Sequence, residues 1–432
     1  MLVTHYPSIQ RSVNKRTITV LVAASSIIAS TLCISSANAA GYQIAFDSVS
    51  GLGRSYAGEA AIGDTAAAMG RNPALMSLFE QAELSGALIY FDGSIDVKGG
   101  SDAFSSNDTV PAQFVPSTYY VHPIDEKIAV GLGVYSNYGL GTDLKDDFAA
   151  GDIGGDTSLL SVNFNPAVSY RINPMLSLGG GVSLIYATGE VNRHYGASGG
   201  NFNKNSSDKL LSWDADDWAF GWNVGALVEL DENNRFGLAY RAGVDLELSG
   251  DFIDHTVGFV AIPGGGSADS VSNVPLPATI EFSGFHQLNN TLAVHYSALW
   301  TQWSDYTEFK ASGAGCSING GTCFVKPEKY DDSWRWALGA TYQLNQAVTL
   351  RAGVALDEKA GATTLSIPDQ DALWLSTGLN YTYSPEWSFD VGLAYMDRSK
   401  ETFKETSLFV GEQEYQTKGY LVIVGAQANY RF

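Results

Sequence analysis

From about residue 82 to the C-terminus, apolar and polar residues alternate with a period of two. In the stretch 220–230 the even positions are apolar, and their odd neighbours are mainly Gly, Asn and Glu. The same alternation recurs in 373–383 and in 387–395. Because successive side chains of a strand point to opposite faces of a sheet, each stretch is typical of a strand with one apolar face. Soluble β-sandwiches also alternate, so the period alone does not choose an architecture.

The lengths of the connections favour a barrel that spans a membrane. Short turns, such as the one at Asn289-Asn290, alternate with long polar stretches, such as 193–216. This asymmetry is typical of an up-and-down transmembrane barrel, and aromatic residues near the strand ends fit its interfacial girdles. The chain ends in an alternating strand closed by Phe432, which resembles the signal that the outer-membrane assembly machinery reads.

The predicted fold is therefore all-β, a 14-stranded antiparallel transmembrane β-barrel with both chain ends on the periplasmic side. The expected strands lie near 82–98, 111–122, 127–138, 157–171, 175–192, 217–229, 235–250, 276–288, 291–310, 329–343, 347–358, 371–384, 386–399 and 418–432.

The N-terminus has the organisation of a secretory signal peptide. Three basic residues precede an uncharged apolar stretch at 18–34, and Ala37-Asn38-Ala39 supplies the small-x-small cleavage pattern. The alternative is an N-terminal membrane anchor. We predict a signal peptide over 1–39, and its removal takes away three of the 25 basic residues and none of the 46 acidic ones. The formal net charge then changes from −21 to −24.

Residues 40–81 do not alternate, and they are rich in Gly and Ala. Such a segment ahead of a closed barrel is either a flexible tail or a plug inside the lumen. Its composition is too apolar for a solvated tail, so we predict an N-terminal hatch over 40–81 and a barrel over 82–432.

Composition and charge exclude several other classes. Charged residues make up only 16% of the chain, yet only one long apolar run exists, whereas a helical membrane protein needs several. The acidic balance argues against a nucleic-acid partner, which requires a basic face. The acidic clusters do not follow the spacing of an EF-hand calcium loop, and we expect no enzyme, no catalytic residue, no cofactor and no metal site.

Cys316 and Cys323 are the two cysteines outside the predicted signal peptide, and they bracket an Asn-Gly-Gly turn. In an oxidising compartment this arrangement favours a local disulfide at a loop tip. A metal site would need more ligands, and no His lies nearby.

Several segments have distinctive sequences, among them SGLGRSYAGE (50–59), RNPAL (71–75) and SIPDQD (366–371). They resemble segments of the FadL family of outer-membrane transporters for long-chain fatty acids, and the likeness extends from residue 40 to residue 432. The resemblance implies the outer membrane of a Gram-negative bacterium and a 14-stranded barrel with a hatch. It also implies ligand capture by the loops, hatch movement and lateral release into the membrane. The alternative within the same family is a channel for aromatic hydrocarbons or other small hydrophobic compounds.

The partners expected from this resemblance are long-chain fatty acids, outer-membrane lipid and lipopolysaccharide, and the assembly machinery. We expect no nucleic acid and a monomer. By motif alignment, the ligand-binding positions fall on Arg193, Lys326 and Tyr42. The simpler interpretations are a solvated charge at the barrel rim for Arg193 and a loop charge for Lys326.

Two further sets of residues correspond to moving parts of the family. Asn72, Pro73 and Ala74 match its hatch motif, for which a structural turn is the alternative. The kink in the third strand maps around Gly131 and Gly133, although a plain Gly-rich wall explains these residues nearly as well.

One long loop also has an unusual composition. The stretch 252–262 is apolar for a surface loop and either lines a capture groove or packs internally.

Overall fold

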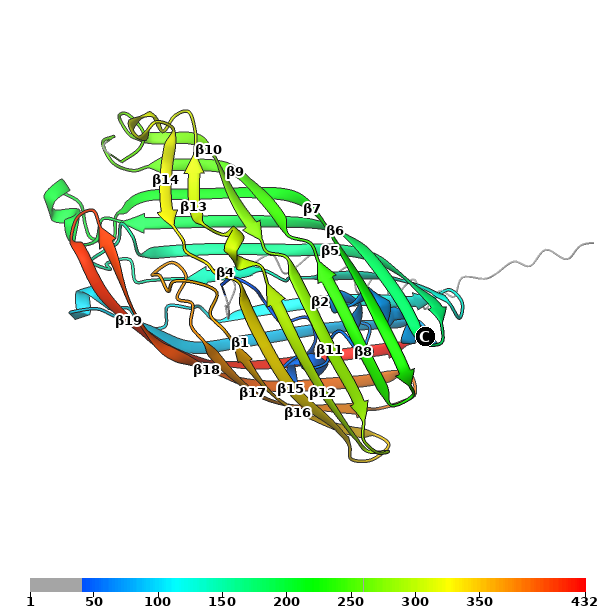
Figure 1. Ribbon diagram of the computed structural model, residues 1–432. Coiled ribbons are helices and arrows are strands. Elements are labelled where there is room, and N and C mark those ends of the chain that lie inside the picture. The colour runs from blue at the N-terminus through cyan, green and yellow to red at the C-terminus, as the bar shows by residue number, and fades with distance from the viewer. Residues whose placement is uncertain (1–40, 259) are drawn as a thin grey trace, which may run out of the picture. The chain divides into compact units, whose positions relative to one another are not determined.

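A computed structural model describes residues 41–258 and 260–432, so the predicted signal peptide lies outside the described residues. The described strands form one antiparallel sheet in which β1 (Glu83–Lys98) pairs with β19 (Gly411–Arg431), and this pairing closes the sheet into a barrel (Figure 1). The connections at one end of the barrel are short turns, whereas those at the other end are long.

Nineteen β-segments make up the sheet within the described residues. In addition to β1 and β19 they are β2 (Gln113–Pro123), β3 (Ile128–Tyr135), β4 (Gly139–Thr142), β5 (Gly155–Asn173), β6 (Leu176–His194), β7 (Lys209–Asp231), β8 (Asn234–Arg241), β9 (Val244–Asp254), β10 (Gly266–Leu276), β11 (Thr279–Gln287), β12 (Leu292–Thr301), β13 (Glu308–Ser312), β14 (Thr322–Pro327), β15 (Ser333–Gln343), β16 (Val348–Asp357), β17 (Ala372–Thr382) and β18 (Trp387–Ser407).

Five of the nineteen segments continue the preceding one after a short interruption: β4, β9, β11, β13 and β15. A continuing segment pairs with the same neighbouring strand; β3 and β4, for example, both pair with β5. The wall therefore contains fourteen antiparallel strands, and the predicted fold is confirmed.

The direction of the side chains explains the alternation along each strand. On β7, Phe220 is 80% exposed on the outside of the barrel, whereas Asn223 is 1% exposed inside. A soluble sandwich would bury its apolar side chains instead. This wall presents them outward, as a barrel surrounded by lipid requires.

Several stretches expected to be polar loops contain strands, and most of β10, which pairs with β9, lies within 251–275. β18 and β19 continue as a hairpin through most of 400–417, and β13 and β14 form a hairpin within 311–328 (Figure 1). In the extension of β18 and β19 only a few side chains, such as Tyr415, are buried, so the ladder of backbone hydrogen bonds persists without a continuous apolar face. The pattern that identifies membrane strands cannot detect such extensions.

The helices are all short. They are α2 (Val49–Leu52), α3 (Ala68–Arg71), η1 (Pro73–Leu78), η2 (Asp102–Phe104), η3 (Gly196–Phe202), η4 (Trp303–Asp305) and η5 (Ser317–Asn319). Among the described residues, none is long and apolar enough to cross a membrane as a helix.

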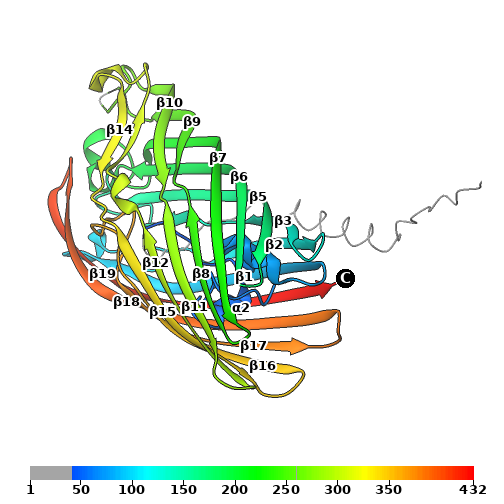
Figure 2. The same cartoon turned by 45° about the vertical axis from the view of Figure 1, so that its right-hand side comes forward.

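The first three helices belong to the hatch, which lies on the concave side of the wall in both views (Figures 1 and 2). Glycines of the wall make this fit possible. A Cβ atom on Gly237 would lie 1.7 Å from the carbonyl oxygen of Ala60, and one on Gly225 would lie 1.8 Å from Oδ1 of Asn72. The bare backbone of the wall therefore lets the hatch approach much more closely than side chains would allow.

Candidate binding pocket

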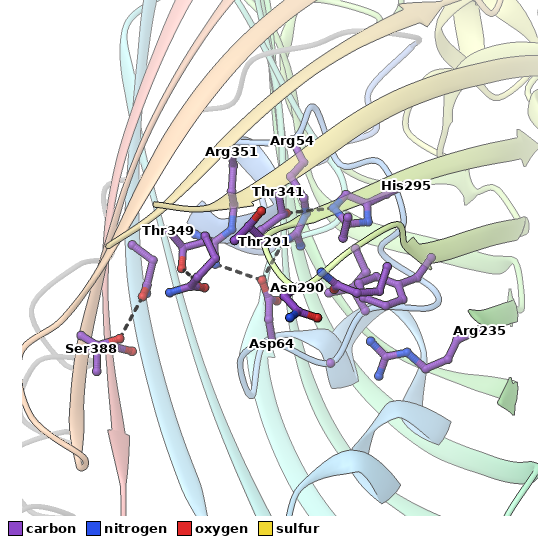
Figure 3. Close-up of a pocket in the computed structure, with 18 of the residues that line it drawn as sticks. Arg54, Asp64, Arg235, Asn290, Thr291, His295, Thr341, Thr349, Arg351 and Ser388 are labelled. Carbon is purple, nitrogen blue, oxygen red and sulfur yellow. Dashed lines mark hydrogen bonds and ion pairs between the residues drawn. The ribbon is translucent and has the colours of Figure 1, made fainter. Parts of the chain in front are cut away.

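One large cavity, the vestibule, lies at the end of the barrel that carries the short turns. This vestibule has a volume of about 630 Å³ (Figure 3). Arg54 in its wall binds Asp64 at 2.6 Å and Glu59 at 2.8 Å, and Arg351 binds Asp64 at 3.1 Å. The wall is therefore largely polar and its charges are mostly paired, which makes it a poor environment for a hydrocarbon chain.

A second cavity, the apolar pocket, lies towards the long connections. Apolar side chains from strands on several sides of the barrel line most of it, among them Leu140, Leu159, Val191, Trp213, Phe309 and Phe324. Its free volume is about 40 Å³, close to that of one water molecule. A long acyl chain therefore fits only if part of the lining moves.

The polar end of the apolar pocket brings together the two cations expected from the sequence. Arg193, at the end of β6, donates from Nη2 to Oγ of Ser366 at 2.9 Å, and Nζ of Lys326 on β14 donates to the same oxygen at 2.9 Å. Both cations line the pocket, and Arg193 is 1% exposed. The simple rim-charge and loop-charge interpretations are therefore wrong for their positions. The serine oxygen marks a place where two cations already share one acceptor.

Glu328 is a pocket residue that the sequence analysis missed. Neither of its side-chain oxygens has a hydrogen-bond partner among the described residues, and it lies beyond the spanning strands, in the connection from β14 to β15. Burial raises the pKa of its carboxyl to about 7, against the opposing effect of Lys326. Glu328 lies two residues after Lys326 on an extended segment, so the two side chains are expected on the same face, and this spacing could have indicated Glu328.

A second glutamate approaches the same cation from outside the pocket. Oε2 of Glu405, on the outer part of β18, lies 3.3 Å from Nζ of Lys326, and Oε1 accepts a hydrogen bond from the backbone N–H of Leu365 at 2.5 Å. No local sequence pattern predicts this contact, because it depends on how far the β18–β19 hairpin extends.

Tyr42 of the hatch forms part of the pocket lining. Its hydroxyl donates to the carbonyl of Pro275, and its ring meets those of Trp303 and Tyr306 edge-on, with centroids 4.7 and 5.4 Å away. The first described residues of the hatch therefore close one side of the apolar pocket.

The motif Asn72-Pro73-Ala74 attaches the hatch to the wall. Asn72 caps η1 through the backbone N–H of Ala74 at 3.0 Å, and its Nδ2 donates to the carbonyls of Ala60 at 2.7 Å and Ala226 at 3.1 Å. The motif is thus both a structural turn and an anchor to β7.

The third strand is interrupted, but not at the predicted glycines. Gly131 and Gly133 stay in register with both β2 and β5, and the interruption lies at 136–138, between β3 and β4. There the hatch replaces the missing pairing, because the N–H of Ile44 donates to the carbonyl of Asn137 at 2.6 Å. Gly131 instead lies where the hatch packs against the wall, because a Cβ there would lie 2.7 Å from the sulfur atoms of Met69 and Met76. A Cβ on Gly133 would meet Tyr119 and Tyr135 of the wall itself.

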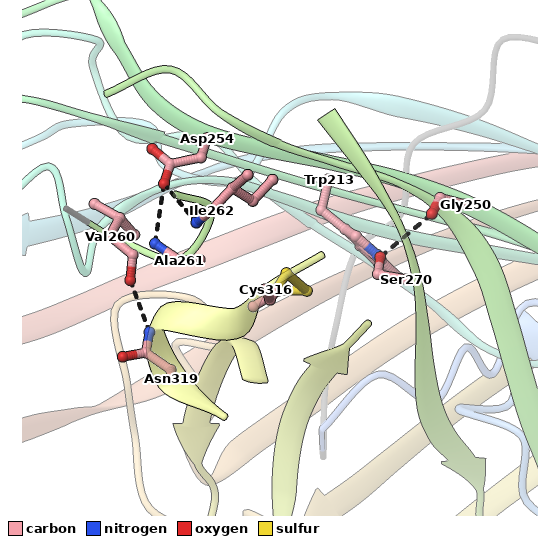
Figure 4. The surroundings of a disulfide bond; sticks show 10 residues. Trp213, Gly250, Asp254, Val260, Ala261, Ile262, Ser270, Cys316 and Asn319 are labelled. Carbon is pink, nitrogen blue, oxygen red and sulfur yellow. Dashed lines mark hydrogen bonds between the residues drawn. A yellow bond between two sulfur atoms is a disulfide. The ribbon is translucent and has the colours of Figure 1, made fainter. Parts of the chain in front are cut away.

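The apolar loop 252–262 is buried at its two ends, whereas Val257 in its middle is 86% exposed. Phe252 is fully buried, and Oδ2 of Asp254 accepts the backbone N–H groups of Ala261 and Ile262 at 2.9 and 3.0 Å. The tip that carries the disulfide lies against this loop: Nδ2 of Asn319 donates to the carbonyl of residue 260 at 2.7 Å (Figure 4).

The structure joins Cys316 to Cys323 by a disulfide, as the sequence predicts for this loop tip. The bond closes the tip of the β13–β14 hairpin, which lies next to the loop 252–262 (Figure 4).

The fold and the pocket together define a plugged transmembrane β-barrel with an internal site for an apolar compound. The chain belongs to the family of outer membrane transport proteins described as OMPP1/FadL/TodX, whose profile matches residues 30–432. It is therefore an outer-membrane protein of a family of transport proteins.

Similar proteins include the 47 kDa outer membrane protein of Pasteurella multocida, at 38% identity over 97% of this chain and 99% of that protein. The long-chain fatty acid transport protein of Escherichia coli is 35% identical over 94% of this chain and 97% of that protein. Among solved structures, a Pseudomonas aeruginosa FadL homologue matches with a TM-score of 0.81 at 22% identity, covering 91% of this chain and 100% of that one. The Pseudomonas putida toluene transporter TodX matches with a TM-score of 0.68 at 18% identity, covering 85% of this chain and 94% of that one.

Proposed function

We propose that this protein transports long-chain fatty acids across the outer membrane. The observation that carries the proposal is the convergence of Arg193 and Lys326 on Ser366 at the polar end of an apolar pocket. Such a site suits a molecule with one carboxylate and a long hydrocarbon chain. The name of the Escherichia coli relative, a long-chain fatty acid transport protein, supports the same ligand.

Hydrophobic burial supplies the driving force for capture. Each methylene removed from water contributes roughly 0.8 kcal/mol, so a long acyl chain gains far more from the pocket than any single charge pair provides. The formal charge of −21 repels an approaching carboxylate, so attraction is confined to the few cations at the site. Arg193 and Lys326 then fix the orientation of the headgroup.

We propose that the ligand leaves sideways into the membrane. Tyr42 and Ile44 lie between the apolar pocket and the interruption at 136–138, and their displacement would connect the two. The hydrocarbon core then receives the chain without exposing it to water. We further propose that the protein acts as a monomer among outer-membrane lipid and lipopolysaccharide after insertion by the assembly machinery.

The test is uptake of labelled oleate by cells that lack their own transporter and express this chain. A correctly assembled, heat-modifiable barrel that does not restore uptake would refute the proposal. The double variant Arg193→Ala with Lys326→Ala should weaken oleate binding about tenfold or more and oleyl alcohol binding much less. Equal losses for the two ligands would rule out the charge role.

The alternative function is a channel for aromatic hydrocarbons or other small hydrophobic compounds. The aromatic side chains of Trp213, Phe309 and Phe324 in the pocket wall favour it, since they offer stacking surfaces. A neutral hydrocarbon has no use for two cations, however. Uptake of toluene with no uptake of oleate would establish the alternative.

A further inference from the structure

Glu405 occupies an unusual position beside the proposed headgroup site. Its carboxylate bridges two elements, with one oxygen 3.3 Å from Nζ of Lys326 and the other on the N–H of Leu365 at 2.5 Å. The side chains of Lys326 and Glu405 are only 12% and 13% exposed, so water screens this ion pair weakly. Glu405 does not line the apolar pocket, whereas Lys326 does.

This geometry divides the ammonium group of Lys326 between two acceptors. It donates to Ser366 on the pocket side and faces Glu405 on the other side. A ligand carboxylate that reaches Lys326 also comes close to the charge of Glu405. The attraction of the ligand carboxylate to Lys326 is therefore already partly neutralised by Glu405. The carboxylate is also repelled by Glu405, and water screens this repulsion only weakly.

We infer that Glu405 is a positioning residue that limits the affinity of the site for anionic headgroups by competing with the ligand carboxylate for Lys326. The inference rests on the proposed function, because it presumes a carboxylate ligand at this site. It assigns a specificity role to the outer part of the β18–β19 hairpin, where Glu405 contacts Lys326 and the N–H of Leu365 in the loop that holds Ser366. The charge of Glu405 also acts on Arg193 at the same end of the pocket.

A different role would have the opposite effect. If Glu405 mainly holds Lys326 in the orientation that the ligand needs, removal of its charge should weaken binding of the anion. The sign of the change in affinity therefore distinguishes competition from orientation.

The test is Glu405→Gln in the full-length barrel, because the amide oxygen can still accept the N–H of Leu365 while the charge is lost. We expect oleate to bind roughly three to ten times more tightly, in line with loss of one weakly screened charge interaction, and oleyl alcohol to bind unchanged. Glu412→Gln is the matched control. It removes an exposed ion pair with Lys404 on the same hairpin and should alter neither affinity.

A second background tests whether the effect passes through Lys326. In Lys326→Gln, the further change Glu405→Gln should raise oleate affinity less than it does in the wild-type background, because only the interaction of Glu405 with Arg193 remains. If Glu405→Gln does not assemble, Glu405→Asp keeps the charge but withdraws it from Lys326, and a smaller gain in oleate affinity is expected.

Unchanged or weaker oleate binding by an assembled variant, or an equal gain for the alcohol, would overturn the inference while the proposed function stands. A wild-type barrel that binds oleyl alcohol but not oleate would instead remove the proposed function, and the inference would fall with it.

Discussion

The unpartnered carboxyl of Glu328 makes anion binding depend on pH in a defined direction. Burial raises the pKa of Glu328 to about 7, so the group is neutral below that pH and negative above it. An anionic headgroup beside Arg193 and Lys326 therefore binds next to a neutral group at low pH and next to a like charge at high pH. We expect affinity to fall as pH rises through about 7.

The size of the effect follows from Coulomb's law. Two like charges about 6 Å apart interact by roughly 3 kcal/mol at an effective dielectric constant of about 20, and nearby cations offset part of this. If the net repulsion that remains is about 1.4 kcal/mol, the affinity for the anion falls tenfold. Folding follows the same sign: the neutral carboxyl contributes stability below its unfolded pKa, and this contribution is lost as pH rises through about 7.

A long-chain alkyl sulfonate is the appropriate probe, because its own charge does not change in this range. Titration between about pH 6 and pH 8.5 should show about tenfold weaker binding at the upper end. Glu328→Gln should give a flat profile at the low-pH affinity. A wild-type profile that is also flat, or a variant that keeps the wild-type pH dependence, would refute the assignment to Glu328. Oleyl alcohol serves as the uncharged control.

Two further predictions concern the hatch and the disulfide. Gly237→Ala should displace the hatch, because the new Cβ would lie 1.7 Å from the carbonyl oxygen of Ala60. The displacement should raise the permeability of cells to large antibiotics, which is the quantity to measure. Gly86→Ala, with open space around it, is the control. Normal permeability in Gly237→Ala would show that the wall yields instead. Cys316→Ser should lower loop stability by up to about 3 kcal/mol and speed protease cleavage near Cys323 without unfolding the barrel, whereas unchanged cleavage would contradict this.

The fold was predictable because the alternation of apolar and polar residues in a membrane strand reflects the lipid on one face and the barrel interior on the other. Phe220 and Asn223 lie on opposite faces of the same strand, with Phe220 outside and Asn223 inside the barrel. The period of two therefore predicts the strand, and the polarity of each residue predicts which face meets lipid. The same reasoning fails beyond the membrane, where no face of the strand meets lipid and β18 continues unrecognised to Ser407.

The site was predictable only in part. The resemblance indicated Arg193 and Lys326, whereas Glu328 was missed although it lies only two residues from Lys326. Glu405 could not be found from the sequence, because it depends on a hairpin that brings it to a cation 79 positions earlier in the chain. The interruption of the third strand was placed too early for a related reason. Gly131 is small because Met69 and Met76 of the hatch occupy the space beside it, and that contact lies between distant segments.

The distribution of interactions within the hatch decides which part of it can move. Removing one partner from a buried ion pair such as Arg54–Glu59 costs about 3–5 kcal/mol, and the core of the hatch is held by such pairs. The segment 42–44 is held chiefly by backbone hydrogen bonds to 137–139 and by the side chain of Tyr42. Each such hydrogen bond contributes only about 1 kcal/mol net. Since buried methylenes of an acyl chain each contribute about 0.8 kcal/mol, entry of a few of them offsets displacement of this segment but not of the hatch core. The ligand should therefore open the side of the pocket that leads to the interrupted strand while the vestibule stays sealed.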